Sequence, residues 1–170
     1  MDTFIIDTKT VTLLLATLFT GLLAGIFFTW ANAVTPGIGK LDDINYLRAF
    51  QNMNRTIQNP LFFLVFFGSM LFSFIAAYCY KSNNAVFWVV TAAALLYFIG
   101  VFLVTILGNI PLNEMLDKTN LTSITLQEAT ILRGKFEAKW NTLHLIRTVI
   151  SLLSFLLLII GCLLKNNTVH

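Results

Sequence analysis

The stretch VTLLLATLFTGLLAGIFFTWANA, residues 11–33, decides the fold class of this chain. It contains no Asp, Glu, Lys or Arg, and it exceeds the roughly 20 apolar residues that a helix needs to cross a bilayer. Three further stretches are also long and apolar: residues 60–80, 85–108 and 143–164, of which only the last contains a charged residue, Arg147. Their apolar runs are continuous and do not alternate with a period of two, which argues against a membrane β-barrel. The sequence therefore predicts four transmembrane helices.

The composition of the whole chain agrees with membrane insertion. Of its 170 residues, 57% are hydrophobic and 11% are charged, and the mean hydropathy is +0.80. These values exclude an ordinary soluble domain, and the net charge of +3 gives no reason to expect a nucleic acid as partner. We expect a single membrane domain over residues 1–170, an all-α integral membrane four-helix bundle whose main partner is the lipid bilayer.

Two long connections between the spans carry helical signals of their own. In the first, acidic residues precede apolar residues at helical spacing, which predicts an amphipathic helix over residues 42–58. In the second, NIPLNEMLDK predicts a short helical turn, and residues 125–141 predict a helix that leads into the fourth span. Residues 81–84 only reverse the chain. Both long connections are therefore expected on the same side of the membrane.

Basic residues are concentrated on the side of the two long connections. That side holds Lys40, Arg48, Arg55, Lys118, Arg133, Lys135 and Lys139, and the other holds Lys9, Lys81 and Lys165. Because cytoplasmic loops carry an excess of Lys and Arg, this distribution predicts cytoplasmic connections and termini on the outer side.

Gly21 and Gly25 form a face of small residues in the first span. Such a face lets a second helix approach closely. The first interpretation is packing inside the bundle, and the alternative is a homo-oligomer formed through Gly21 and Gly25.

The fourth span begins with a polar stripe. Trp140, His144, Arg147 and Ser151 follow one another at helical spacing, so they share one face. No acidic residue lies within any span, and a guanidinium without a fixed counter-ion suits an anionic ligand or a developing oxyanion. The alternative is that Arg147 reaches the lipid headgroups and Trp140 belongs to an interfacial aromatic belt.

Amides from the other elements are expected at the same depth in the membrane. They are Asn32 in the first span, Gln51 and Asn54 in the loop helix, and Asn109 and Asn113 at the end of the third span. These groups predict a polar chamber, closed by the loop helix, that offsets part of the cost of burying Arg147.

Metal and haem sites find little support in the sequence. Cys79 and Cys162 are lone thiols, and no group of Cys and His has the spacing of a metal site. His144 could hold haem iron, but no second histidine lies in a span and His170 is a poor second ligand. Nucleophile triads, phosphate loops and dinucleotide motifs are also missing from the sequence. We expect no metal and no cofactor, and keep a haem-binding protein built on His144 as an alternative.

Four blocks, in order, resemble the anthrone-oxygenase-like family of small membrane proteins, long catalogued in bacteria as a domain of unknown function. The blocks are WANAVTPGIGKL (30–41), AFQNMNRTIQNPLFF (49–63), GNIPLNEML (108–116) and KWNTLHLIRTVIS (139–151). The resemblance runs through most of the chain. It implies a four-helix protein of the membrane, which we expect to be a bacterial inner membrane.

The resemblance also implies an activity. Some members oxidise an anthrone to an anthraquinone with molecular oxygen, without flavin, haem or metal. Carried onto this chain, the implied site residues are Asn54, Pro60, Asn109, Pro111, Asn113, Trp140, His144 and Arg147.

We assign provisional roles to these residues. His144 is the base because an imidazole titrates near neutrality, and Arg147 stabilises the oxyanion with Asn109 or Asn54. Trp140 stacks on a flat, apolar substrate, which Asn113, Gln51 and Asn32 help to bind. The alternative function is a non-catalytic membrane subunit that binds a lipid, a quinone or a partner helix.

Overall fold

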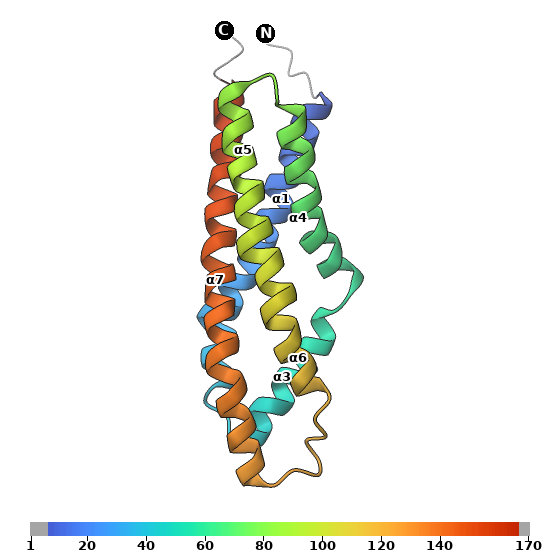
Figure 1. Cartoon of the computed structure of the whole chain (residues 1–170), viewed down its shortest axis with the longest axis vertical. Coiled ribbons are helices and arrows are strands. Elements are labelled where there is room, and N and C mark those ends of the chain that lie inside the picture. The colour runs from blue at the N-terminus through green and yellow to red at the C-terminus, as the bar shows by residue number, and fades with distance from the viewer. Residues whose placement is uncertain (1–6, 167–170) are drawn as a thin grey trace.

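The computed structural model describes residues 7–166, and within this range every regular element is a helix (Figure 1). In chain order the elements are α1 (Thr8–Thr29), η1 (Trp30–Val34), α2 (Thr35–Ile38), α3 (Asp43–Ile57), α4 (Pro60–Cys79), α5 (Asn84–Tyr97), η2 (Phe98–Leu103), η3 (Thr105–Asn109), α6 (Ile110–Asp117) and α7 (Leu126–Asn166). The three η elements are π-helical turns.

Four of the helical stretches are long and apolar enough to cross a membrane, which confirms the predicted fold class. They are Thr8–Ile38, Pro60–Cys79, Asn84–Asp117 and Leu126–Lys165. Side-chain caps begin three of them: Asp7 accepts from the backbone N–H of Thr10, Asn59 from that of Phe62, and Asn83 from that of Val86. These caps satisfy backbone donors that a helix start leaves unpaired.

Helix length shows which parts project beyond the lipid. The 20 residues of α4 rise about 30 Å, which is close to the hydrocarbon thickness of a bilayer. The 41 residues of α7 rise about 60 Å, so its first turns extend past the end of α4. The predicted helix 125–141 and the predicted span 143–164 are in fact one continuous helix, and α6 continues the third span without a break.

The first turns of α7 pack with α3 and α6 at one end of the rod (Figure 1). We call these three elements the cap. Its apolar core consists of Tyr46, Leu47, Phe50, Leu112, Leu116, Leu121, Ala129, Phe136 and Trp140. The amphipathic pattern that predicts a helix at 42–58 therefore exists because α3 has one face on this core and the other in solvent.

Arg133 of α7 ties the start of α3 to the cap. Its guanidinium donates to the backbone carbonyls of Gly39 and Leu41, and it pairs with Asp43 at 3.0 Å and Glu137 at 2.7 Å. Thr130, one turn earlier on α7, donates to Asp43 at 2.5 Å. These bonds fix the position of α3 against the first turns of α7, at the end of the membrane-spanning bundle.

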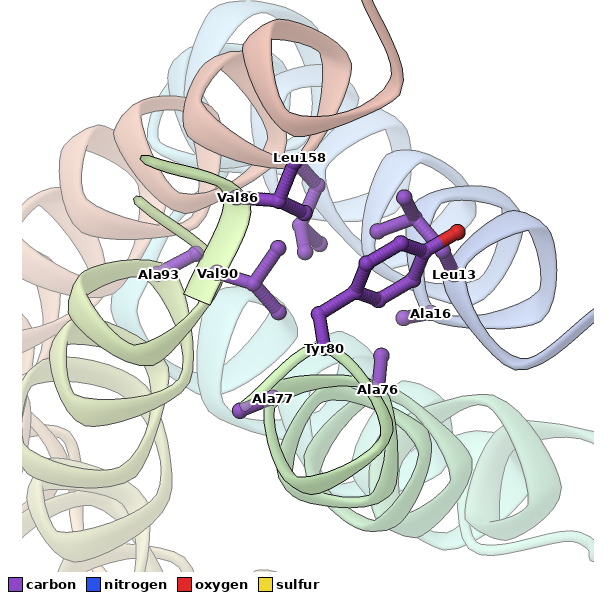
Figure 2. Packing of buried hydrophobic residues seen from close by; sticks show 9 residues of the cluster. All are labelled: Leu13, Ala16, Ala76, Ala77, Tyr80, Val86, Val90, Ala93 and Leu158. Carbon is purple, nitrogen blue, oxygen red and sulfur yellow. The ribbon is translucent and has the colours of Figure 1, made fainter. Parts of the chain in front are cut away.

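The opposite end of the bundle is closely packed. Its core is built largely from alanine and valine: Leu13, Ala16, Ala76, Ala77, Tyr80, Val86, Val90, Ala93 and Leu158. Figure 2 shows these side chains converging from α1, α4, α5 and α7, with the Tyr80 ring extending from the end of α4 toward α1. Small side chains let the helices approach closely where lipid gives no hydrophobic driving force between them.

The two glycines of the first span have different surroundings. A Cβ placed on Gly21 would lie 2.7 Å from the ring of Phe155 on α7, whereas one on Gly25 would meet nothing within 4 Å. Gly21 thus serves packing inside the bundle. Gly25 lies on an open outer face, where the oligomer contact stays a prediction.

Candidate functional site

A cavity of about 310 Å³ lies where the cap meets the membrane-spanning bundle. Its walls come from α1, η1, α3, α4, the third span and α7. The lining residues are Ile26, Phe27, Trp30, Phe50, Asn54, Ile57, Gln58, Phe62, Phe63, Phe66, Phe67, Thr105, Ile106, Ile110, Asn113, Glu114, Asp117, Trp140, His144 and Arg147. Most of these side chains are aromatic or aliphatic, as in sites for apolar small molecules. A chamber lies at the predicted depth, but it is mostly apolar and not polar as predicted, and α3 forms its wall on the side of the cap.

His144 and Arg147 of α7 form a hydrogen-bonded pair in the wall of this cavity. The Arg147 Nη2 lies 3.0 Å from His144 Nδ1, and His144 Nε2 lies 3.1 Å from the backbone carbonyl oxygen of Phe27. A guanidinium can only donate and a carbonyl can only accept. His144 is therefore the neutral tautomer that carries its proton on Nε2, and both ring nitrogens are engaged.

Arg147 is buried without a counter-ion. Its Nη1 donates to the Thr105 hydroxyl at 3.1 Å, and its Nε–H is buried with no acceptor. The guanidinium lies 4.7 Å from the ring centroid of Phe27. Within residues 7–166 no carboxylate lies within ion-pair distance of it. An unpaired, desolvated cation of this kind favours an anion or a developing oxyanion.

A series of aromatic rings in contact extends from the cap to His144. The Trp140 ring stacks on the imidazole with centroids 4.8 Å apart and an interplanar angle of 17°. The Phe50 ring of α3 meets the Trp140 ring edge-on, with centroids 4.7 Å apart. Trp140 Nε1 donates to Asn113 Oδ1 at 2.7 Å. Trp140 is thus a buried wall of the site and does not sit in an aromatic belt at the membrane interface.

Two of the three π-helical turns, η1 and η3, contribute residues to the cavity wall. Trp30 begins η1, three residues after Phe27, and Thr105 begins η3. Each π-helical turn inserts a residue into the helix and often marks a functional site. Here the turns accompany the carbonyl that holds His144 and the hydroxyl that holds Arg147.

The structure brings five of the predicted residues to the cavity: Asn54, Asn113, Trp140, His144 and Arg147. The Asn54 side chain lines it from α3, and none of the bonds within the described chain involves its amide group. Asn54 is therefore available to a ligand, while Asn113 is already committed to Trp140.

Three predicted residues do not reach the cavity. Gln51 donates to the carbonyls of Leu116 and Thr119 and so completes the end of α6. Asn109 is buried behind the wall and donates to the carbonyl of Trp140 at 3.4 Å. Asn32 lies exposed on η1. The predicted binding roles of Gln51 and Asn32 and the predicted catalytic role of Asn109 do not match these positions.

The prolines of the matching blocks also have local roles. Pro60 occupies the first turn of α4, where a missing N–H costs no helical bond. Pro111 lies where η3 runs directly into α6, so its missing N–H removes one bond from a continuous helix. Both prolines are exposed. They shape the chain beside the cavity without lining it.

Thr105 holds Arg147, as expected for a polar group at the end of an apolar span. Two other residues at the site were not predicted from the sequence. Phe27 supplies the carbonyl for His144, and Trp30 lines the cavity with a buried indole N–H that has no acceptor among the described residues. Phe27 contributes through its backbone, which no side-chain pattern reveals.

Metal ligands are sparse in the described part of the chain. No group of three His, Cys, Asp or Glu side chains there could hold a metal ion. His170 lies outside the described residues. A role for His144 as a haem ligand would require one of its two ring bonds to break. The expectation that no cofactor is used stays a prediction.

Comparison with known proteins supports the resemblance. The family described as Anthrone oxygenase matches residues 62–157, which is more than half of the chain. No curated protein and no solved structure gives a significant match. The matched region includes most of the cavity wall, from Phe62 of α4 to His144 and Arg147 of α7. The chain therefore belongs to the anthrone oxygenase family of membrane proteins.

Proposed function

We propose that this chain is a membrane oxygenase that oxidises an anthrone-like or other apolar, quinone-type ring with molecular oxygen, without a metal or organic cofactor. The observation that carries the proposal is the buried Arg147 guanidinium in the wall of an aromatic cavity, which has neither a counter-ion nor an acceptor for its Nε–H among residues 7–166. Family membership supports the reaction type.

The proposed reaction needs a base and an oxyanion site. An anthrone has an acidic CH₂ opposite its carbonyl. Removing one proton gives a delocalised enolate whose negative charge lies largely on the carbonyl oxygen. Arg147 stabilises that oxygen, and Asn54, which has an unbonded amide, is placed to assist. The enolate is electron-rich enough to transfer an electron to O₂ directly.

The remaining steps balance without a further reductant. The two radicals combine at the same carbon, and a proton converts the product to a hydroperoxide. Loss of the remaining C–H proton and cleavage of the O–O bond release water and leave the second quinone carbonyl. One anthrone and one O₂ thus give one anthraquinone and one water.

The hydrogen bonds of His144 mask the proposed base. His144 Nδ1 accepts from Arg147 at 3.0 Å, so its lone pair is not available to a substrate in this arrangement. A substrate oxygen that draws Arg147 Nη2 toward itself would release Nδ1. Binding of the oxyanion and activation of the base are then one event, which would keep His144 neutral and inactive until a ligand is in place.

Oxygen uptake tests the proposal. The purified protein is mixed with emodin anthrone, and the rate is corrected for spontaneous oxidation. We expect His144→Gln to lower turnover by about 10²–10⁴-fold, the usual contribution of a general base. Leu145→Ala is the matched control, because Leu145 is the next residue on α7 and faces away from the cavity. Full activity of His144→Gln would refute the assignment of the base.

A second candidate is a non-catalytic subunit that holds a lipid, a quinone or a partner helix in the same cavity. The engagement of both His144 ring nitrogens favours it, because neither nitrogen is then free to act as a base. Tight binding of an anthraquinone together with no oxygen uptake above background would select this candidate.

We also propose that the cap is cytoplasmic and that the membrane is a bacterial inner membrane. The cap and its connections carry most of the Lys and Arg residues of the chain. The C-terminus should then lie outside the cytoplasm. A reporter fused to it should be active if it works outside the cytoplasm, and inactive if it works only in the cytoplasm. An active cytoplasmic reporter at that position would reverse the orientation.

A further inference from the structure

One wall of the cavity is open toward the lipid. Phe63 and Phe67 of α4 and Ile106 of η3 all line the cavity, yet their exposed fractions are 42%, 45% and 38%. A side chain that lines an internal space and is also exposed on the outer surface lies at an opening. These three apolar residues therefore form the edges of a gap between α4 and the third span.

The arrangement of the helices explains the gap. Along the bundle α4 packs against α1 and α5, while η3 packs against α7 and continues into α6. In Figure 1 the first turns of α4 lie apart from the lower part of the third span. The bulky rings of α4 in this half, in place of the alanines of its other end, keep the two helices separated.

The gap lies within the hydrocarbon layer. Phe63 and Phe67 follow Pro60, the first residue of α4, by three and seven positions. At 1.5 Å per residue they lie about 5 and 10 Å along the helix from its cap-side end. Because α4 just matches the bilayer in length, this depth corresponds to the outer part of the acyl chains, below the headgroups.

The cavity has a second, polar edge toward the cap. Gln58, Glu114 and Asp117 line it there and are exposed. Glu114 pairs with Lys118, and Asp117 pairs with Arg55. An apolar ring would cross this charged edge at a cost, because it would have to leave the lipid before it reached the site. The lipid-facing edge imposes no such step.

We infer that the ligand of this cavity, a flat fused-ring aromatic molecule dissolved in the cap-side leaflet, enters sideways between Phe63 and Phe67 of α4 and Ile106 of η3. The identity of the ligand rests on the proposed function. The route itself does not depend on any chemical step. Ile106 is then the gate residue, and the polar edge at Gln58 exchanges water and protons.

Binding kinetics in lipid nanodiscs test this route. The probe is 1,8-dihydroxyanthraquinone, an oxidised ring that does not turn over, and the signal is quenching of the two tryptophans that line the cavity, Trp30 and Trp140. The third tryptophan of the chain, Trp88, is exposed on α5 and is replaced by Phe in every variant. Association and dissociation rates are measured separately.

We expect Ile106→Phe to slow association and dissociation together by at least about tenfold, with little change in affinity, because it narrows the passage and leaves the bound state intact. Leu107→Phe is the matched control, since Leu107 is 75% exposed, adjacent in sequence and absent from the cavity wall. Gln58→Phe narrows the polar edge and should leave both rates unchanged.

Three outcomes would overturn the inference: unchanged rates in Ile106→Phe, equal slowing in Leu107→Phe, or slowing in Gln58→Phe instead. Failure of the probe to bind at all would also overturn it. Oxygen uptake plays no part in this measurement. A chain that binds the ring through the gap without oxidising an anthrone would therefore refute the proposed oxygenase and leave the route standing.

Discussion

At the end away from the cap, α1, α4, α5 and α7 meet through alanine and valine. At the cap end the same helices meet through phenylalanine, tryptophan and a buried guanidinium. The first region consists of regular α-helix, and the second contains the π-helical turns η1 and η3. The first has a core of small, closely packed side chains, and the second holds a cavity of about 310 Å³. The comparison shows how one bundle divides its length between packing and a site.

The sequence of α4 shows the same division between its two halves. Its first half reads PLFFLVFFGS and its second half reads MLFSFIAAYC. Ala76 and Ala77 let the second half pack closely against its neighbours, while Phe62, Phe63 and Phe67 hold the first half away from the third span. The closely packed end therefore holds the helices together, and at the cap end the same helices can stand far enough apart to leave room for a ligand.

The largest expected effect comes from Arg147→Met, which should change the two properties of the molecule in opposite directions. Loss of the oxyanion donor should lower oxygen uptake by about 10²–10³-fold. Loss of a buried donor without an acceptor should remove a cost of about 1–3 kcal/mol from the folded state. We expect a higher Tm together with lost turnover.

Arg147→Lys tests whether the function of Arg147 depends on the planar shape of the guanidinium or only on its positive charge. Lysine keeps the charge and loses the planar fork that reaches Thr105 and His144 together. Turnover as low as in Arg147→Met would assign the function to the fork. A lower Tm in Arg147→Met would contradict the view that Arg147 is held at a cost for function.

The second prediction compares the introduction of a leucine at each of the two ends of the bundle. Ala16 is fully buried in the closely packed end, so Ala16→Leu should overpack it and destabilise the protein by about 1–3 kcal/mol. Asn54 faces the cavity with an unbonded amide, so Asn54→Leu has room and should leave Tm unchanged or raised. Thermal unfolding in one detergent measures both. Equal losses would mean that the cavity is not free space.

The third prediction uses two glycines. A Cβ on Gly100 would lie 2.6 Å from Ile150 Cγ2 and 3.0 Å from its Cβ, which cannot move without the helix. Gly100→Ala should therefore cost about 1 kcal/mol by overpacking. Gly25→Ala meets open space and should stabilise by about 0.4–1 kcal/mol through the unfolded chain.

The Gly25→Ala variant also tests whether the outer face of α1 forms an oligomer contact. If a second copy of the chain packs on Gly25, then Gly25→Ala should destabilise and shift the oligomer toward monomer in light scattering. A stabilised variant with an unchanged mass would argue against that contact.

The sequence contained enough information for the helices and for the centre of the site. His144 and Arg147 stand out because polar residues are rare in apolar spans, and their helical spacing places them on one face with Trp140. Asn54 and Asn113 could be added because they flank the spans at the same depth. The pattern of α3 shows that it has a buried face, and the structure shows that this face closes the chamber.

The placements that differ from the expected ones have a common physical origin. Spacing along a helix says which residues share a face, but not which neighbour that face meets, so Gln51 was assigned to the cavity although it completes the end of α6. The π-helical turn that begins at Trp30 changes the angular position of the residues after it, and Asn32 is exposed as a result. Backbone partners such as the Phe27 carbonyl have no side-chain signature at all.

The smallest expected effect concerns the attachment of the cap. The hydrogen bond from Thr130, more than the charge of Arg133, lowers the pKa of Asp43 below its ordinary value. A carboxyl group whose pKa is lower in the folded state stabilises that state at pH values above its unfolded pKa. The stabilisation is lost as the pH falls through the folded value. Acidification below about pH 4 should therefore loosen α3 from α7, whereas changes between pH 6 and 8 should not.

Hydrogen exchange of the α3 amides measures this loosening against the amides of α4 as an internal reference. Asp43→Asn should raise α3 exchange modestly at pH 7 and make it less sensitive to acid. Asp42→Asn is the matched control: it keeps a capping side chain at the start of α3, and Asp42 bonds to Asn45 and not to α7. If acid loosened α3 equally in Asp43→Asn, the sensitive group would lie elsewhere in the cap. Because α3 also closes the cavity, the same treatment should speed the release of a bound anthraquinone, which would link the attachment of the cap to the opening of the site.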